Sequence, residues 1–283
     1  MANWQLLSGN SLDRLKELPS QSVNTIVTSP PYFGLRDYCV DGQLGLESNP
    51  NDYVEIIVSV IREAKRILKD DGSLWLNVGD SYAANRTYQV PSTKGGAKHS
   101  LGQSVGGKGS KVPEGMKSKD LIGIPWMLAF ALRADGWYLR QDIIWQKPNV
   151  MPESVKDRCT KSHEYIFLLT KKDKYYFDHL AVQEDAIKGA RNRRSVWSIS
   201  TTQFKGAHFA VFPEALAEPC ILAGCPEDGT VLDPFSGAAT TGVVALKNNR
   251  NYIGIELNPE YNLLAAGRLE QTMLTIQAKK GTD

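Results

Sequence analysis

Residues 231–242 read Val-Leu-Asp-Pro-Phe-Ser-Gly-Ala-Ala-Thr-Thr-Gly, which predicts the end of a strand, a tight turn and the start of a helix. Such a turn presents backbone N–H groups and the positive end of a helix dipole to a ligand. Glu256 ends the next predicted strand and follows Asp233 by 256 − 233 = 23 residues. An acid about twenty residues past such a turn can bind ribose hydroxyls, so we expect a cofactor that carries adenosine.

This turn has neither the Gly-x-Gly-x-x-Gly pattern of dinucleotide sites nor the Gly-Lys-Ser/Thr of phosphate-binding loops. A dehydrogenase or an ATPase therefore has little support. Taken alone, the stretch fits a strand–turn–helix unit built only for packing equally well.

A second stretch, Thr28-Ser29-Pro30-Pro31-Tyr32, directly follows the predicted strand 23–28. Two prolines end the strand and fix the backbone, so that the Pro30 carbonyl can point out of the sheet. Ligands of open α/β sheets lie outside this carboxyl edge. A carbonyl, the Ser29 hydroxyl and the flat Tyr32 ring suit a planar amino group, which needs two hydrogen-bond acceptors and a stacking surface. The alternative is a strand end with a buried tyrosine.

Strand-like and helix-like apolar patterns alternate along the chain, which predicts an α/β fold. We expect helices at 12–18, 52–68, 125–133, 213–223 and 239–247 and from 259 onward. We expect strands at 23–28, 73–78, 137–145, 164–169, 230–232 and 252–255. Asp52 would cap the second helix, and Asp70-Asp71-Gly72 would end it.

The composition is that of an ordinary globular protein, with 283 residues, 42% hydrophobic and 23% charged, and a net charge of +2. It argues against a disordered chain and a coiled coil, and no apolar run approaches the ~20 residues that a membrane helix needs. The start lacks a signal-peptide pattern, and the four cysteines form no Cys-x-x-Cys pair. We expect a cytoplasmic protein with reduced thiols, no metal site and no membrane partner.

Together, the two stretches resemble the paired signature of DNA amino-methyltransferases, which use S-adenosylmethionine. Residues 233–241 are similar to the family's cofactor loop, Asp-Pro-Phe-x-Gly-Ser-Gly-Thr-Thr, and residues 29–32 to its catalytic loop, (Asp/Asn/Ser)-Pro-Pro-Tyr. The catalytic loop comes first, as in the beta class. The resemblance implies a Rossmann-like S-adenosylmethionine-dependent methyltransferase fold. Its mainly parallel sheet would carry helices on both faces, with a circularly permuted motif order and a small target-recognition insertion.

The resemblance also implies roles for individual residues. The catalytic residues would be Ser29, Pro30, Pro31 and Tyr32. The cofactor-binding residues would be Asn10, Asp233, Pro234, Phe235, Ser236, Gly237, Ala239, Thr240, Glu256, Asn258, Phe209 and Pro213. The DNA-binding residues would be Lys147, Lys156, Arg158, Lys161, Arg191, Arg193 and Arg194. Where the family has Ser and Gly, Ala238 and Ala239 stand, and Ala239 would place a methyl near the cofactor and disfavour a positive φ.

By the same comparison, the chain divides into three parts. Residues 1–146 would form the catalytic half of the methyltransferase domain, with a flexible basic insertion at 86–119. Residues 147–208, which are basic and aromatic, would form the target-recognition region, and residues 209–283 the S-adenosylmethionine-binding half. The insertion either orders on a polyanion or is a plain surface loop.

The implied reaction transfers a methyl group from S-adenosylmethionine to the exocyclic amino nitrogen of a base flipped out of double-stranded DNA. Tyr32 would stack on the base, while the Pro30 carbonyl and the Ser29 hydroxyl accept the amino hydrogens. Serine at the first position of the tetrad favours N4 of cytosine, with N6 of adenine as the alternative. A homodimer and a cognate restriction endonuclease, in a restriction-modification system, are the candidate protein partners.

Three other functions compete with this one. A cytosine C5-methyltransferase needs a nucleophilic cysteine, for which Pro219-Cys220 is a candidate, although it lies in an apolar helix pattern. RNA and protein-glutamine methyltransferases usually carry Asn first and place this loop after the cofactor loop. A non-catalytic DNA-binding protein would need a decayed cofactor loop, and the intact residues 29–32 argue against it.

Overall fold

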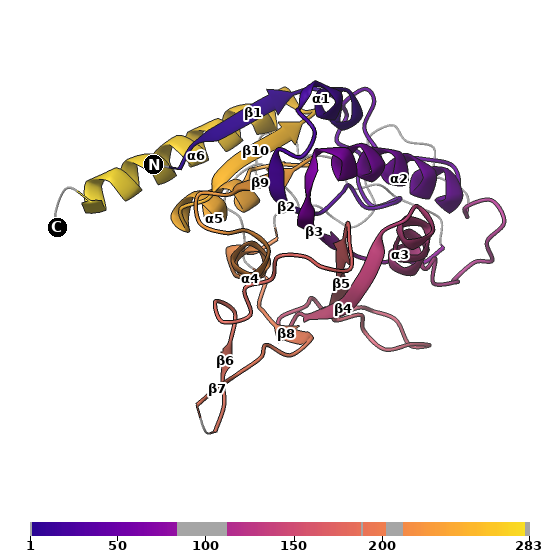
Figure 1. Cartoon of the computed structure of the whole chain (residues 1–283). Coiled ribbons are helices and arrows are strands. Elements are labelled where there is room, and N and C mark those ends of the chain that lie inside the picture. Colours follow the sequence, from indigo (N-terminus) through magenta and orange to yellow (C-terminus); the bar gives the residue numbers. More distant parts are fainter. Residues whose placement is uncertain (1, 84–111, 188, 202–211, 281–283) are drawn as a thin grey trace.

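The computed structural model describes residues 2–83, 112–187, 189–201 and 212–280, and most strands in these ranges join one eight-stranded sheet (Figure 1). In spatial order they are β1 (Trp4–Ser8), β10 (Asn251–Glu256), β9 (Thr230–Asp233), β2 (Val23–Thr28), β3 (Leu68–Val78), β5 (His163–Thr170), β4 (Tyr138–Gln146) and β8 (Val196–Ser198). Neighbours from β1 to β3 are parallel, β5 is antiparallel to both β3 and β4, and β8 is parallel to β4. The predicted mainly parallel sheet is confirmed.

Helices cover both faces of this sheet (Figure 1). They are α1 (Ser11–Glu17), α2 (Pro50–Ile67), α3 (Ile124–Ala134), α4 (Glu214–Gly224), α5 (Thr240–Lys247) and α6 (Pro259–Lys280). On one face, α1, α2 and α3 share a core with Ile26 and Leu76. On the other, α4, α5 and α6 share a core with Val27 and Trp75. Neighbouring residues of β2 and β3 enter opposite cores because successive side chains of a strand point to opposite faces.

Both ends of α2 differ from the prediction. The helix begins at Pro50, and its cap is Asn49, whose side chain accepts from the Asp52 N–H at 3.0 Å. Proline suits the first helical turn, because its missing N–H would have no partner there. At the other end, β3 begins directly at Leu68, so Asp70, Asp71 and Gly72 lie in a strand and do not end the helix.

The predicted recognition region at 147–208 is partly built into the sheet. It contributes β5, which lies between β3 and β4, and the edge strand β8. A short hairpin of β6 (Glu184–Asp185) and β7 (Ala190–Arg191) projects away from the sheet (Figure 1). Most of the predicted insertion at 86–119 lies outside the described residues, as do residues 202–208. No described helix is both long and apolar enough to cross a membrane.

The contact between α5 and its neighbours makes a testable prediction. A Cβ at Gly242 would lie 2.5 Å from Tyr252 Cδ1 and 2.8 Å from Leu269 Cδ2, in a buried core. We expect Gly242→Ala to lower the free energy of unfolding by about 2 kcal/mol through overpacking. Gly267 in α6 has open space around its Cβ position, so Gly267→Ala should raise stability by about 0.5–1 kcal/mol. Urea denaturation of the two variants checks this, and equal effects would contradict the packing described.

Candidate active site

The two loops singled out in the sequence emerge beside each other at the carboxyl edge of the sheet. Strand β2 pairs with β9, with Ile26 opposite Leu232, so Ser29 and Pro234 begin neighbouring loops. A side-chain hydrogen bond joins the strand ends, since Thr28 Oγ1 donates to Asp233 Oδ1 at 2.6 Å. Two loops that lie about two hundred residues apart in the chain are thereby tied together.

The carboxylate of Asp233 is used inside the protein. The residue is 2% exposed, and it also accepts hydrogen bonds from Thr241 Oγ1 at 2.9 Å and from the Phe235 N–H at 3.0 Å. Burial raises the pKa of Asp233 from 3.8 to about 6, although the hydrogen bonds from Thr28, Phe235 and Thr241 oppose this shift. Asp233 therefore shapes the turn, with both of its oxygens already bonded within the chain.

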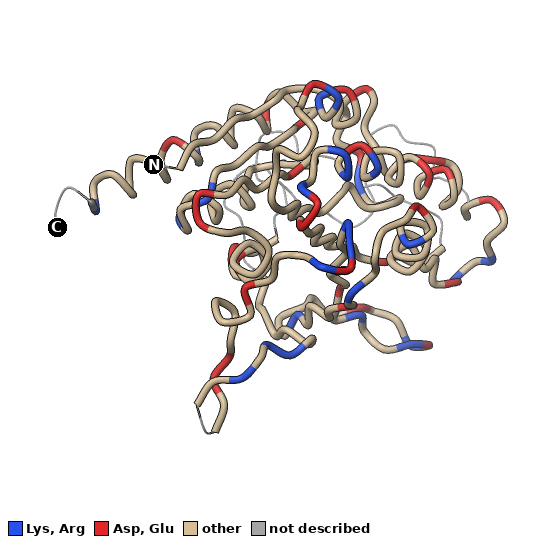
Figure 2. The backbone as a smooth tube through the Cα atoms, in the orientation of Figure 1, with Lys and Arg blue, Asp and Glu red and all other residues tan. Residues whose placement is uncertain are grey.

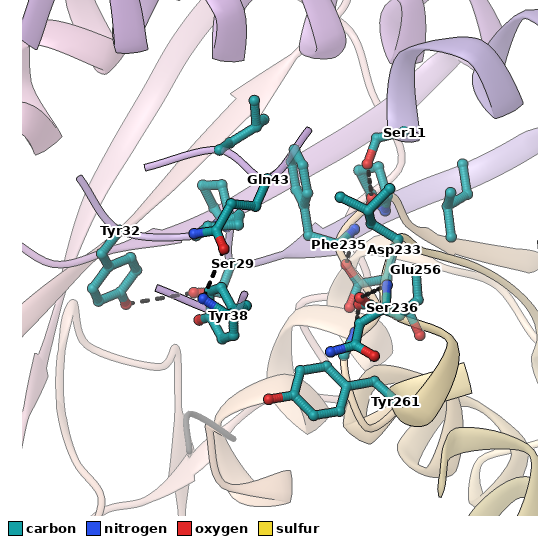
Figure 3. Close-up of a pocket in the computed structure, with 18 of the residues that line it drawn as sticks. Ser11, Ser29, Tyr32, Tyr38, Gln43, Asp233, Phe235, Ser236, Glu256 and Tyr261 are labelled. Carbon is teal, nitrogen blue, oxygen red and sulfur yellow. Dashed lines mark hydrogen bonds between the residues drawn. The ribbon is translucent and has the colours of Figure 1, made fainter. Parts of the chain in front are cut away.

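The turn that follows is fixed from two sides. Ser11 Oγ donates to the Pro234 carbonyl at 2.6 Å, and the Gly237 N–H donates to Glu256 Oε2 at 2.8 Å. Glu256 Oε1 accepts from the Asn258 N–H at 2.8 Å. Burial raises the pKa of Glu256, and these backbone donors oppose that rise. Figure 3 shows Ser11 and Glu256 close to the turn.

In the loop after β2, the carbonyl of Pro31 is hydrogen-bonded within the protein, whereas that of Pro30 is free among the described residues. Tyr53 Oη donates to the Pro31 carbonyl at 2.8 Å, whereas none of the described residues donates to the Pro30 carbonyl. Ser29 Oγ donates to Tyr32 Oη at 3.4 Å. Burial raises the pKa of Tyr32, and the charge of the nearby Glu164 raises it further. A carbonyl and a hydroxyl at this strand end can accept hydrogens from a ligand.

Both loops line one cavity of about 750 Å³. Of the predicted site residues, those that line it are Asn10, Ser29, Pro30, Pro31, Tyr32, Lys147, Asp233, Pro234, Phe235, Ser236, Gly237, Thr240, Glu256 and Asn258. Figure 3 shows Ser29 and Tyr32 toward one end of the cavity and Phe235 and Glu256 toward the other. The structure thus brings the two predicted loops to a single site.

Comparison with known proteins identifies the family that has this arrangement. The sequence model described as DNA methylase (N6_N4_Mtase) matches residues 23–266. The chain belongs to this family. The Type II methyltransferase M.Cfr9I of Citrobacter freundii is 54% identical over 94% of this chain and 87% of its own length. The Type II methyltransferase M.SmaI of Serratia marcescens is 51% identical over 95% of this chain and 91% of its own length.

Solved structures of DNA methyltransferases share the fold. The PvuII DNA methyltransferase (cytosine-N4-specific) has a TM-score of 0.71 at 22% identity, over 95% of this chain and 86% of that one. TTHA0409 of Thermus thermophilus, solved with S-adenosyl-L-methionine, has a TM-score of 0.64 at 23% identity, over 96% of each chain. The fold is that of S-adenosylmethionine-dependent DNA methyltransferases.

S-adenosylmethionine is the cofactor of this DNA methylase family, and the cavity fits it. Its volume of about 750 Å³ lies within the ~300–1,000 Å³ of small-molecule sites. An ionised carboxylate has about four acceptor positions, so Glu256 can receive ribose hydroxyls in addition to its two backbone donors. Within the described ranges, no group of three or more His, Cys, Asp or Glu residues could hold a metal ion.

Two described residues predicted to bind the cofactor, Ala239 and Pro213, do not line the cavity. Ala239 adopts a φ of 56°, in the left-handed region that alanine was expected to disfavour, and its methyl is buried in the core between α4, α5 and α6 and does not line the cavity. Ala238 lines the cavity in its place. Pro213 is the buried cap of α4, and Phe212 reaches the cavity instead. Phe209 lies outside the described residues.

Most of the predicted DNA-binding side chains have partners within the protein. Arg191 and Arg194 both pair with Glu184 Oε1, at 2.8 and 2.6 Å, and Arg193 lies over the Trp197 ring. Lys161 Nζ donates to the Asp80 carbonyl at 2.7 Å. In addition, Arg158 lies over the Tyr82 ring and pairs with Glu153, Lys147 faces the cavity, and Lys156 is exposed. Figure 2 shows acidic residues beside the basic ones in this part of the chain.

The cavity residues that sequence analysis missed include two pairs of interest, Asn77 with Glu164 and Tyr38 with Tyr261. Asn77 and Glu164 each stand as a polar residue in an apolar strand, which is the one signal that could have revealed them. Tyr38 and Tyr261 meet edge to face with ring centroids 6.2 Å apart, and both line the cavity. No local pattern marks these tyrosines, because they come together only in the folded chain.

The raised pKa of Asp233 predicts a pH dependence of stability. Folded Asp233 holds its proton more tightly than the unfolded chain does, so this contribution is present below pH 3.8 and is lost as the pH rises through about 6. Asparagine cannot titrate. We expect the stability of Asp233→Asn relative to the parent protein to increase by about 1 kcal/mol between pH 5 and pH 8 in urea denaturation. A difference that stays constant between pH 5 and pH 8 would show that the Asp233 carboxyl has an ordinary pKa and would contradict the prediction.

Proposed function

We propose that this DNA methylase transfers the methyl group of S-adenosylmethionine to N4 of cytosine at specific sites in double-stranded DNA. The observation that carries the proposal is the shared cavity. Ser29, Pro30 and Tyr32 line one part of it, and the turn at Phe235–Gly237 with Glu256 lines another. The Thr28–Asp233 hydrogen bond fixes the distance between them.

The residues at the Tyr32 end suit an exocyclic amino group. A base within a duplex cannot reach a buried cavity, so it is flipped out at a cost of a few kcal/mol. The open Pro30 carbonyl and the Ser29 hydroxyl accept the two amino hydrogens, and the Tyr32 ring stacks on the base. The cofactor supplies a methyl group on a positively charged sulfur. The protein contributes mainly by holding the nitrogen and the methyl group in line.

Ser29 supports cytosine over adenine as the target, because in the DNA amino-methyltransferases that this chain resembles, serine at the first position of the tetrad favours N4 of cytosine. N6 of adenine is the alternative, and the same acceptors would serve its amino group. In this proposal the exposed basic residues between 148 and 201, such as Lys156, Arg191 and Arg194, contact DNA phosphates and base edges, for which Lys and Arg are well suited.

The high identity to proteins named Type II methyltransferases supports a role in a restriction-modification system. A cognate restriction endonuclease would then act on the same DNA sites, and methylation would protect them. A homodimer and a location in the cytoplasm complete the proposal.

Cys220 does not support the C5-methyltransferase alternative. It is 2% exposed inside α4, its thiol donates to the Leu216 carbonyl at 3.4 Å, and it does not line the cavity. Burial raises the pKa of this thiol, which disfavours the thiolate that attacks a base. The loop order and the family membership likewise speak against an RNA or protein-glutamine methyltransferase, and the complete cavity against a non-catalytic DNA-binding protein.

Nucleoside analysis tests the proposal. The protein is incubated with S-adenosylmethionine and unmethylated plasmid DNA, and the digested nucleosides are analysed by mass spectrometry. We expect N4-methylcytosine, and at least a tenfold slower single-turnover rate for Tyr32→Ala, because misplacing the base by about 1 Å can cost a hundredfold in rate. N6-methyladenine would refute the choice of cytosine, and the absence of any methylated base would refute the function.

A further inference from the structure

The hydroxyl of Tyr32 is anchored at the back of the cavity. Tyr32 Oη donates to Glu164 Oε2 at 2.7 Å and lies 3.2 Å from Asn77 Oδ1. Asn77 Nδ2 also donates to Glu164 Oε2, at 3.3 Å, and to the Tyr165 carbonyl, at 3.1 Å. The ring of the catalytic loop is therefore connected to two strands of the sheet, β3 and β5.

Glu164 is itself held by a charged partner. Its other oxygen, Oε1, pairs with Lys147 Nζ, and the two side chains are only 15% and 17% exposed. Lys147 Nζ also lies 4.2 Å from the centroid of the Trp145 ring. A largely buried ion pair adds little net stability, because desolvation costs several kcal/mol per ion. A role in fixing local geometry explains this pair better than a role in stability does.

Gly79 leaves room for the Tyr32 ring to lie against the sheet. A Cβ at Gly79, directly after β3, would lie 2.7 Å from Tyr32 Cε2 and 3.3 Å from Glu164 Cδ. Any larger residue would push the ring away from the sheet. With its hydroxyl bonded to Glu164 and its edge against Gly79, the ring is restricted to one orientation before a base arrives.

We infer that Glu164 and Lys147 are positioning residues that act through the Tyr32 hydroxyl and fix the plane of the stacking ring. The inference rests on the proposed function, since it concerns the ring on which the flipped base stacks. It assigns a part in aligning the amino nitrogen to Glu164 in β5 and to Lys147, directly after β4, both of which lie outside the two sequence motifs. Holding the ring in place before the base binds lowers the free-energy barrier to methyl transfer, because the ring need not be ordered in the transition state.

A double-mutant cycle tests whether Glu164 acts through Tyr32. Single-turnover methyl transfer from labelled S-adenosylmethionine is measured for the parent protein, Tyr32→Phe, Glu164→Ala and the double variant. We expect each single change to slow transfer about tenfold or more, with the dissociation constants for cofactor and DNA changed less than about threefold. The double variant should be no slower than Glu164→Ala alone. Glu164→Gln keeps a hydrogen-bond acceptor and should recover much of the rate.

Glu214→Gln is the matched control, because it breaks an exposed ion pair with Lys247 and Glu214 does not line the cavity. It should leave the rate unchanged. Multiplicative effects of Tyr32→Phe and Glu164→Ala, or a parent-like rate for Glu164→Ala, would overturn the inference.

The same four proteins are also compared in urea, which requires no substrate. We expect Tyr32→Phe to shift the urea midpoint in the parent background and much less in the Glu164→Ala background. Equal shifts would overturn the inference even if no methylated base were found. By contrast, formation of N6-methyladenine would refute only the proposed target base, since the cycle measures total methyl transfer.

Discussion

The hydrogen bond from Thr28 to Asp233 is the contact on which the site depends. Thr28 is the last residue of β2, and Asp233 is the last residue of β9. One loop that follows them carries Ser29 and Tyr32, and the other forms the turn that meets Glu256. Because both partners are buried, this bond is protected from competition by water. Under the proposed function, this bond sets the separation between the amino group bound at Pro30 and the methyl donor at the turn.

The remaining contacts extend this arrangement in both directions. On the turn side, Ser11 and Gly237 fix the backbone against α1 and β10. On the catalytic side, Tyr53 holds Pro31, and Glu164 holds Tyr32. These contacts leave the Pro30 carbonyl and the Ser29 hydroxyl free to accept hydrogen bonds from a ligand. The buried polar side chains thus hold the two loops in place, as expected where catalysis relies on orientation.

The sequence predicted the features that depend on local chemistry. Pro30 and Pro31 end β2 because proline has no N–H to donate to the sheet, and the stretch 231–242 carries strand, turn and helix signals in close succession, so the strand end, the strand–turn–helix unit and the fold class are confirmed. The side on which a methyl lies depends on packing, and for that reason Ala239 points into the core and not to the cofactor site.

Other features arise only from long-range pairing. Glu164 reaches Tyr32 because β5 runs antiparallel to β3, which no pattern in the strand 164–169 reveals. The misplaced cap of α2 has a local cause instead. Asn49 and Asp52 are both good cap residues, and Pro50, which suits the first helical turn, makes Asn49 the cap.

The most direct measurement compares Thr28→Val with Thr28→Ser in single-turnover methyl transfer at saturating cofactor and DNA. Valine removes the donor to Asp233 and keeps nearly the same volume, whereas serine keeps the donor. If the bond fixes the distance between the two loops, Thr28→Val should be at least about tenfold slower than the parent while Thr28→Ser stays within a few fold. A parent-like rate for a folded Thr28→Val would show that the two loops are aligned without this bond and would contradict the account.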